Sequence, residues 1–557
     1  MIDLLVRGGL VVDGSGGPPF AGDVAVDAGR ITSIGHLGAV EARTTLDADG
    51  CVVTPGFIDA HTHLDAQLCW DPDGSPSHLH GVTTVVTGCC GFGVAPAEPG
   101  TLDFLLRTFE AVEEIPYESS SSGVTQSWVG FDEYLDHLDG LELGVNVVAL
   151  VPHSALRVFA LGEDADRRAE PAEVDRMVGA LGDAIRAGAA GFASTRGLNH
   201  ADHRGRRIPS AVADDAELEA LVAACSGRTW QMDLRTKQSV DAAEVRAEVE
   251  VYAQWAQRWG VRLTWTPLMS DNAEKIDVAL AQAEHWARQG VRLAPQIGAQ
   301  AVTTTLSLSE RGVASRLWPH LAETGFFESS ADTRRAALGD AATRAAMGVP
   351  GAIGSVRRPD PATWTVLQHG NRHVAGRRLG ELAEELGVAP IDALCELVID
   401  DPAATFTVAI ANADQDAMVR LLANEHTLVG LGDAGAHLRS ITNYTYPTTM
   451  LAALVRDQGA LSLEHAVATM TSAPADLFGV ADRGRLTAGL AADLNVIDLD
   501  ALRLGPLERR HDLPAGAPRL YQPAEGYRYT VVGGRVSRVD GAVVARSGKV
   551  VRCRPGA

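Results

Sequence analysis

Two histidines one residue apart, His61 and His63, are the first feature of the sequence that could do chemistry. They stand in GFIDAHTHLD, at the end of an apolar run that is typical of a buried strand. Residues i and i+2 of a strand point the same way, so both imidazoles can face one point. Imidazole binds zinc and similar divalent ions. The pair therefore predicts one edge of a metal site, and the alternative is a pair of ordinary polar residues.

The elements that would position these histidines are strand-like runs that alternate with helical stretches through the middle of the chain. Two clear helical stretches are EVDRMVGALGDAIRAG and AEVRAEVEVYAQWAQRWG. Eight β/α units in one block favour an α/β fold of the (β/α)8 TIM-like barrel type over an open doubly wound sheet. The eight runs are residues 52–61, 81–90, 144–153, 188–196, 228–236, 261–269, 291–297 and 427–435.

The two ends of the chain differ in style from the middle. Short strand-like runs with Gly and Asp turns fill both ends and predict a small β-sandwich domain formed from both chain termini. We expect this domain to comprise residues 1–54 and 477–557, with the barrel at 55–476. The segment 298–426 between the last two runs is too long for one crossover connection, so we expect it to hold an insertion in the barrel. SSSSGVTQS, residues 119–127, is expected to be a loop.

Six polar or reactive residues fall at or near the predicted strand ends. Active sites of (β/α)8 barrels lie at the carboxyl ends of the strands. Core filling does not explain so many reactive side chains at that end. The residues are His61, Cys90, His153, Arg196, Asp233 and Asp433.

Several motifs together resemble the amidohydrolase superfamily, and in particular its D-aminoacylase (N-acyl-D-amino-acid deacylase) branch. PGFIDAHTHLD resembles the opening signature of the superfamily, and GVTTVVTGCCGFGVAP resembles the Gly-x-Cys-Gly segment of the branch. VNVVALVPHSALR resembles the third-strand segment, and LVGLGDAGAH resembles the segment of the eighth-strand aspartate. LTAGLAADLNVIDLDAL resembles the return to the β domain, so the resemblance extends from residue 1 to about 535.

The resemblance implies roles for four residues. His61 and His63 would bind one metal, with Cys90 as a thiolate ligand. Asp433 would contact the metal and act as the catalytic base. The alternatives are a buried structural thiol for Cys90 and a turn or capping residue for Asp433.

The chain departs from the branch at strands five and six, which there each end in a metal-binding histidine. Here strand five reads RTWQMDLRT, with Asp233 at the aligned position, and strand six reads VRLTWTPLM without a histidine. Lys237 lies nearby, and we do not assign it as a carbamylated ligand. We therefore expect one divalent metal per chain, most simply zinc, rather than two.

Candidate substrate contacts are spread over several segments. The arginine that binds the substrate carboxylate in the branch is not at its expected position, so Arg196 and Arg439 are candidates for that role. Their alternative is ion pairing at the surface. His153, Asp233 and His437 complete the candidate set, and His153 is equally compatible with a buried structural role.

Composition excludes several classes of partner. The formal net charge of -23 disfavours nucleic acid and anionic membranes as partners. Seven cysteines without framework spacing indicate a reduced, cytoplasmic protein. The N-terminus reads as a strand rather than a signal peptide, and no stretch has a membrane-spanning length. We expect a small-molecule substrate, and a homo-oligomer is compatible with the sequence.

The predicted reaction is metal-dependent hydrolysis of a C–N amide bond in a small N-acylated amino-acid-like substrate. Metal-activated water would attack, with Asp433 taking its proton. A cyclic amide or a carbamate would fit the same machinery. A lyase or isomerase reaction on the same scaffold is a rival, and so is a metal-free, inactive binding protein.

Overall fold

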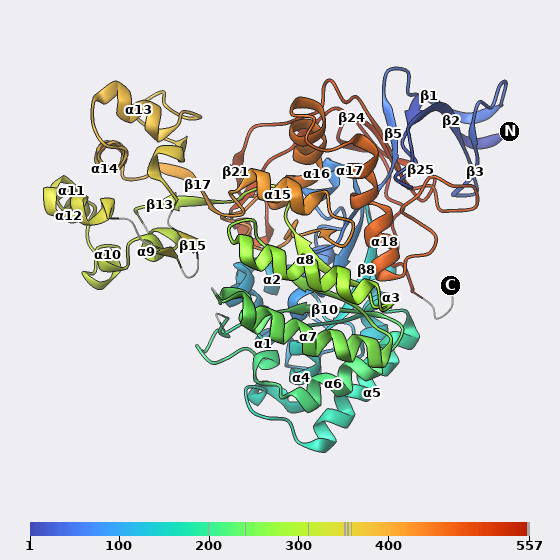
Figure 1. The fold of residues 1–557 in the computed structure, drawn as a ribbon, viewed down its shortest axis with the longest axis horizontal. Coiled ribbons are helices and arrows are strands. Elements are labelled where there is room, and N and C mark those ends of the chain that lie inside the picture. The colour runs from blue at the N-terminus through green and yellow to red at the C-terminus, as the bar shows by residue number, and fades with distance from the viewer. Residues whose placement is uncertain are drawn as a thin grey trace. The chain divides into compact units, whose positions relative to one another are not determined.

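The fold is described from a computed structural model of the chain (Figure 1). It describes residues 1–553 except 199, 240, 310, 350–351, 354–355 and 358, with the backbone alone for 238, 352–353 and 356–357. The described chain divides into two compact units. The first contains residues 1–300, 416–438 and 442–557, and the second contains residues 301–415 and 439–441.

Eight parallel strands of the first unit form the barrel sheet, in the order β18-β12-β11-β10-β9-β8-β7-β6. Each strand lies within one of the eight runs expected from the sequence. The sheet closes because Asp433 N–H donates to His61 O (3.1 Å) and His63 N–H donates to Ala434 O (2.7 Å). The strands are β6 (Phe57–Asp59), β7 (Val82–Thr87), β8 (Asn146–Pro152), β9 (Gly191–Thr195), β10 (Thr229–Asp233), β11 (Arg262–Thr266), β12 (Leu293–Ile297) and β18 (Leu428–Val429).

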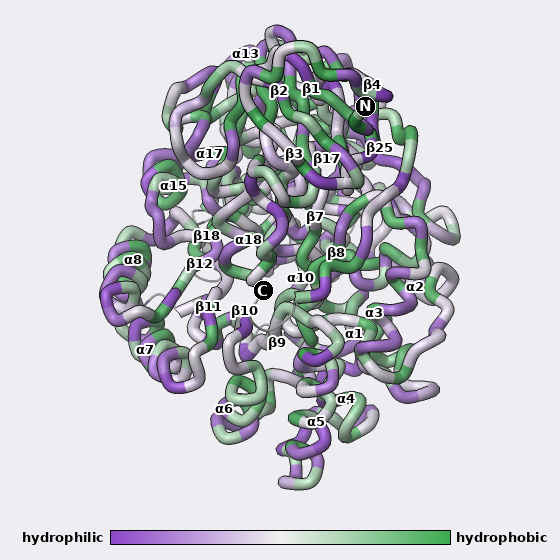
Figure 2. The backbone as a smooth tube through the Cα atoms, turned by 90° about the vertical axis from the view of Figure 1, so that its right-hand side faces the viewer, coloured by the Kyte–Doolittle hydropathy of each residue, from purple (hydrophilic) through white to green (hydrophobic). Residues whose placement is uncertain are grey.

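Burial and capping explain why these segments form strands and helices. Strands β7, β8, β9 and β10 are buried at every residue, as parallel strands covered on both faces require. Helix α5 (Pro171–Ala187) begins with proline and ends at Gly188 in the left-handed region. Helix α7 (Ala242–Trp259) is capped by the Asp241 side chain. Figure 2 shows α5, α6 (Asp215–Ala224), α7 and α8 (Ala273–Ala287) around strands β9 to β12.

Strands from both chain ends form one nine-stranded mixed sheet. The N-terminal strand β5 (Val52–Pro55) pairs antiparallel with the C-terminal strand β19 (Leu494–Ile497). Buried aliphatic side chains from both ends, such as Val24 and Val531, share one core. The N-terminal members also include β1 (Ile2–Val11), β2 (Phe20–Asp27), β3 (Arg30–Gly35) and β4 (Ala42–Asp47), and the C-terminal members include β24 (Tyr527–Val532), β25 (Arg535–Val539) and β26 (Ala542–Val543).

The second compact unit has its own sheet and core. Strand β17 (Thr405–Ala411) pairs antiparallel with β13 (Val302–Ser307) on one side and β16 (Thr365–Gln368) on the other. Its core contains Trp318, Trp364 and Phe406. Its helices are α9 (Val313–Leu317), α10 (Pro319–Glu323), α11 (Ala331–Gly339), α12 (Ala341–Gly348), α13 (Leu379–Leu386) and α14 (Pro390–Asp400).

One expectation about local structure was wrong. Residues expected to form a loop at 119–127 partly belong to α2 (Tyr117–Gly123). Two serine hydroxyls there donate to carbonyls one turn earlier, Ser120 Oγ to Pro116 O (3.0 Å) and Ser122 Oγ to Glu118 O (2.5 Å). Among the described residues, no helix is long and apolar enough to cross a membrane.

Candidate metal centre

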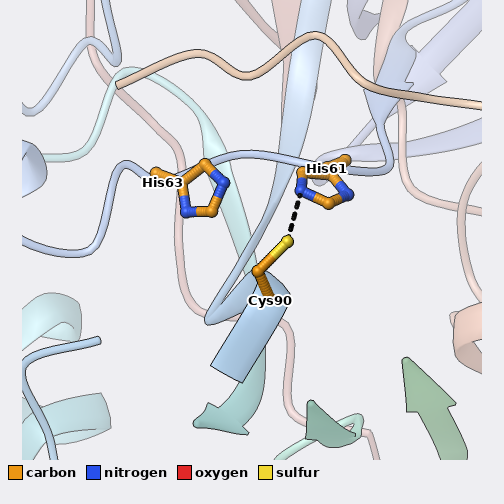
Figure 3. Close-up of side chains that lie close together, drawn as sticks. All are labelled: His61, His63 and Cys90. Carbon is orange, nitrogen blue, oxygen red and sulfur yellow. Dashed lines mark hydrogen bonds between the residues drawn. The ribbon is translucent and has the colours of Figure 1, made fainter. Parts of the chain in front are cut away.

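His61 and His63 follow strand β6 and are both buried, at 1% and 2% exposure. His61 Nδ1 lies 2.6 Å from Gln296 Oε1, which can only accept a hydrogen bond, so Nδ1 carries the proton. The unprotonated Nε2 therefore faces the barrel mouth, 3.4 Å from Cys90 Sγ (Figure 3). Such a neighbour fixes the tautomer and the orientation of a metal-binding imidazole.

Cys90 lies in the short 3-10 helix η3 (Cys89–Gly91) directly after β7. Its backbone is in the left-handed region (φ 53°), which is strained for a residue with a side chain. The Cys90 N–H donates to Gln231 Oε1 of β10 at 2.7 Å and holds the turn in place. Gly88 permits this turn, because a Cβ there would lie 2.1 Å from Leu150 O.

Asp433 follows the last barrel strand, β18. Its Oδ1 lies 3.6 Å from His61 Nε2 and 4.0 Å from His63 Nε2. Its backbone is also left-handed (φ 47°), and its side chain is 22% exposed. Asp433 thus borders both histidines and remains accessible from the mouth.

The donor set fits a divalent metal such as zinc. One ligand atom each of His61, His63 and Cys90 lies within 4.8 Å of the other two. Burial and the neighbouring His61 lower the pKa of His63 to about 3, so its ring is neutral, as a ligand must be. Its Nδ1 is buried without a hydrogen-bond partner among the described residues. Burial raises the pKa of the Cys90 thiol, and a bound cation would reverse that shift.

Glu113 is a residue at this centre that the sequence analysis missed. It ends helix α1 (Leu102–Glu113) and is buried, with Oε2 3.8 Å from His63 Nε2 and 3.7 Å from His437 Nε2. The His437 N–H also donates to Glu113 O (2.5 Å). The sequence signal that could have identified it is its position on the apolar face of the amphipathic helix α1, where a glutamate is unexpected.

His437 is the predicted substrate residue that the structure brings to the centre. Burial opposes its charge, but a hydrogen bond to Glu114 and the charges of Glu113, Glu114 and Asp433 raise the pKa of His437 to about 9. The ring therefore carries a positive charge at neutral pH, beside Asp433.

Asp233 and Lys237 form a buried ion pair at the end of β10. Lys237 Nζ donates to Asp233 Oδ2 at 2.6 Å, and Thr195 Oγ1 donates to the same oxygen at 2.6 Å. The Lys237 side chain is 12% exposed and the Asp233 side chain is 1% exposed. The predicted substrate residue Asp233 is thus already paired on one oxygen.

His153 makes contacts that favour a structural role over the expected substrate contact. Its Nδ1 lies 2.8 Å from Ser194 Oγ and its Nε2 lies 2.9 Å from Glu217 Oε1. Arg157 pairs with the same buried glutamate. Both ring nitrogens of His153 are therefore taken by protein groups.

The two predicted arginines lie in other surroundings. Arg196 Nη1 donates to Asp215 Oδ1 (2.5 Å), and Arg196 lines a cavity of about 770 Å³ together with Arg235 and Tyr252. None of the four predicted metal ligands lines that cavity. Arg439 belongs to the second compact unit, where its carbonyl accepts a hydrogen bond from Thr305 Oγ1 (3.3 Å).

Nitrogen, sulfur and carboxylate donors that converge at the carboxyl end of a (β/α)8 barrel are typical of a metal-dependent hydrolase. A family model described as amidohydrolase family matches residues 44–538. The chain therefore belongs to the amidohydrolase family.

Individual relatives support this membership. The N-acyl-D-glutamate deacylase of Alcaligenes xylosoxydans xylosoxydans is 30% identical over 511 residues, which cover 90% of this chain and 88% of that protein. The N-acyl-D-aspartate deacylase of the same organism is 28% identical over 514 residues, covering 89% and 86%.

A solved structure supports the fold. The N-acyl-D-glutamate deacylase of Bordetella bronchiseptica, complexed with zinc and a phosphonate mimic of the tetrahedral intermediate, has a TM-score of 0.66 and 28% identity. The match covers 99% of each chain. The expected branch, fold class and class of enzyme, a hydrolase acting on carbon–nitrogen bonds other than peptide bonds, are confirmed.

Proposed function

We propose that the chain hydrolyses the amide bond of a small N-acylated amino-acid-like substrate and uses one divalent metal, most simply zinc. The observation that carries this proposal is the convergence of His61, His63 and Cys90 within 4.8 Å, with Asp433 beside both histidines. The names of the relatives support the substrate class, since they act on N-acyl-D-glutamate and N-acyl-D-aspartate. The zinc in the Bordetella bronchiseptica structure supports the metal.

The four predicted ligands would bind the metal, and one of them, Asp433, would also transfer protons. His61, His63, Cys90 and the Asp433 carboxylate would hold the ion, and Asp433 Oδ1 lies beside both histidines. A bound divalent metal lowers the pKa of water from about 15.7 to about 7. The Asp433 carboxylate would take a proton from the attacking water and deliver it to the leaving nitrogen, so it would act first as base and then as acid.

Among the predicted substrate residues, His437 is the one that we propose as a contact. Its positive charge lies beside Asp433 and suits the carboxylate of an N-acyl amino acid. Arg196 lines a cavity that none of the four predicted ligands lines, and both ring nitrogens of His153 are taken by Ser194 and Glu217, which leaves them weaker candidates. Arg439 and Asp233 also stay predictions.

A second candidate function follows from the departure at strand five, where Asp233 replaces a histidine of the branch. A changed donor set would suit a cyclic amide, a carbamate or a non-hydrolytic lyase or isomerase reaction. A metal-free binding protein is the remaining rival.

Turnover in ¹⁸O-labelled water tests the proposal against its rivals. A panel of N-acetyl D- and L-amino acids is incubated with zinc-loaded protein, and the released acetate is analysed by mass spectrometry. We expect one ¹⁸O in the acetate. Product without solvent oxygen would indicate the lyase or isomerase, and a metal content near zero after gentle purification would indicate the binding protein.

The domain boundaries are likewise a proposal. We divide the chain into a β domain from residues 1–54 and 477–557 and a barrel at 55–476 that carries an insertion around 298–426. Pairing of β5 with β19 and the second compact unit at 301–415 and 439–441 support this division.

A further inference from the structure

The carboxylate of Asp233 is buried and is satisfied on one side only. Thr195 and Lys237 both donate to Oδ2. Oδ1 is buried and has no hydrogen-bond partner among the residues that the structure describes. A buried carboxylate oxygen without a partner costs free energy unless a cation or a donor faces it.

The position of Asp233 relates it to the metal centre. Gln231 and Asp233 are two residues apart on β10, so their side chains point to the same side of the strand. The Gln231 side chain accepts the hydrogen bond from Cys90 N–H. Asp233 therefore follows Gln231 on the side of β10 that faces Cys90, one step nearer the carboxyl end of the barrel.

Lys237 brings a positive charge into the same region. It lies in η6 (Arg235–Gln238), and among the described residues Asp233 is the one hydrogen-bond acceptor of its Nζ. Burial disfavours its charge, but Asp233 raises the pKa of Lys237, so the ammonium stays protonated at neutral pH.

We propose that the Lys237 ammonium occupies the place of a second metal ion and so limits the centre to a single divalent metal. In the D-aminoacylase branch that this sequence resembles, strand five ends in a metal-binding histidine. Here strand five ends in Asp233, whose carboxylate is also a suitable metal ligand. The ammonium and a second divalent cation would compete for that carboxylate, since they would repel each other at such a short distance. The inference rests on the proposed function, which supplies the first metal.

Zinc stoichiometry tests this inference without any measurement of activity. The purified full-length protein is saturated with Zn²⁺, freed of excess by gel filtration and analysed by mass spectrometry for zinc per chain. We expect about one equivalent for the wild type and for Lys237→Arg, which keeps the charge. Lys237→Met and Lys237→Gln should gain about one further equivalent, and Asp233→Asn/Lys237→Met should return to one.

Lys275→Met is the matched control, because Lys275 Nζ donates to the Lys237 carbonyl (3.1 Å) but not to Asp233. It should keep one equivalent. Circular dichroism checks that each variant is folded. If Lys237→Met does not fold, Lys237→Gln alone measures the effect of removing the charge on zinc stoichiometry.

Two outcomes would overturn the inference while the proposed function stands. One is a single equivalent in folded Lys237→Met and Lys237→Gln, which would make the pair an internal salt bridge. The other is two equivalents in the wild type, which would also change the proposed count of one metal per chain but not the proposed hydrolytic reaction. A wild type that binds no zinc would instead overturn the metal-dependent function itself, and the inference with it.

Discussion

At the residue scale, two of the candidate ligands, His61 and Cys90, are each held by a polar neighbour that is remote in sequence. Gln296 orients His61 from 235 residues away, and Gln231 holds Cys90 from 141 residues away. The types and spacing of His61 and His63 were readable in the sequence because a strand fixes the side to which i and i+2 point. Their neighbours were not, because only the closure of the barrel brings these strands together.

Asp433→Asn tests the base. The amide keeps the shape of the side chain but cannot take a proton from water, so we expect kcat to fall by about 10²- to 10⁴-fold. The midpoint of thermal unfolding should stay close to that of the wild type. Asp416→Asn, at an exposed position, should leave kcat unchanged. Activity that survives in Asp433→Asn would rule out the assigned role.

His63 gives a stability prediction for the metal-free protein. The pKa of His63 is about 3 in the folded protein and 6.5 as a free side chain. Below pH 6.5 His63 therefore binds a proton in the unfolded chain but stays unprotonated in the folded chain. The contribution of His63 is therefore complete above pH 6.5 and is lost as the pH falls from 6.5 to about 3.

Urea unfolding in the presence of a chelator, repeated over this pH range, measures the effect. His63→Gln should show a flatter decline of the free energy of unfolding than the wild type. His36→Gln, which changes an exposed histidine, should follow the wild type. Equal slopes for His63→Gln and the wild type would contradict the buried, neutral state of His63.

At the scale of elements, the barrel strands followed the sequence closely and the connecting segments did not. Eight buried apolar runs gave the eight strands in their order, because parallel strands inside a barrel have an unmistakable pattern. Glu113 was missed because a glutamate near a helix end normally faces solvent. Here α1 ends against His437, whose N–H bonds to the Glu113 carbonyl.

Glu217→Gln tests the structural role of His153. Helix α6 carries Glu217 to a buried network with His153 of α4 (His153–Leu161) and Arg157 of the same helix. Loss of the charge leaves Arg157 unpaired, so we expect the free energy of unfolding to fall by about 3–5 kcal/mol. The KM of the remaining folded enzyme should hardly change.

Glu219→Gln on the same helix is the control, because the partly exposed Glu219 pairs with Arg258 (2.5 Å) at the surface. Its effect should stay below about 1 kcal/mol. A large rise of KM in Glu217→Gln, without loss of stability, would instead return His153 to the substrate site.

At the scale of the whole molecule, the first compact unit draws on both ends of the chain. The C-terminal tail pairs with strand β8, since Val147 N–H donates to Lys549 O (3.0 Å) and Val551 N–H donates to Val147 O (2.7 Å). Val550, Val551 and Cys553 of the tail are buried. The tail thus belongs to the packing of the barrel, although its sequence reads as part of the β-rich end.

A chain that ends at Arg546 tests this contribution. Burial of one aliphatic side chain is worth about 1.5–3 kcal/mol, so loss of the tail should lower the free energy of unfolding by several kcal/mol. Chemical denaturation measures it, with Val544→Ala as control, because Val544 is 57% exposed. Unchanged stability of the shortened chain would contradict the packing of the tail against β8.

The sequence by itself determined the barrel fold and the family, and it predicted the β domain from both ends and the site residues His61, His63, Cys90 and Asp433. These features depend on local periodicity and on short motifs, which are set by residues close together in the sequence. Only the tertiary structure decided the partners of each side chain: Glu113 beside His63, Glu217 on His153, and Lys237 on Asp233. Such contacts depend on how distant elements meet, and a buried charge is stable only with the partner that the fold supplies.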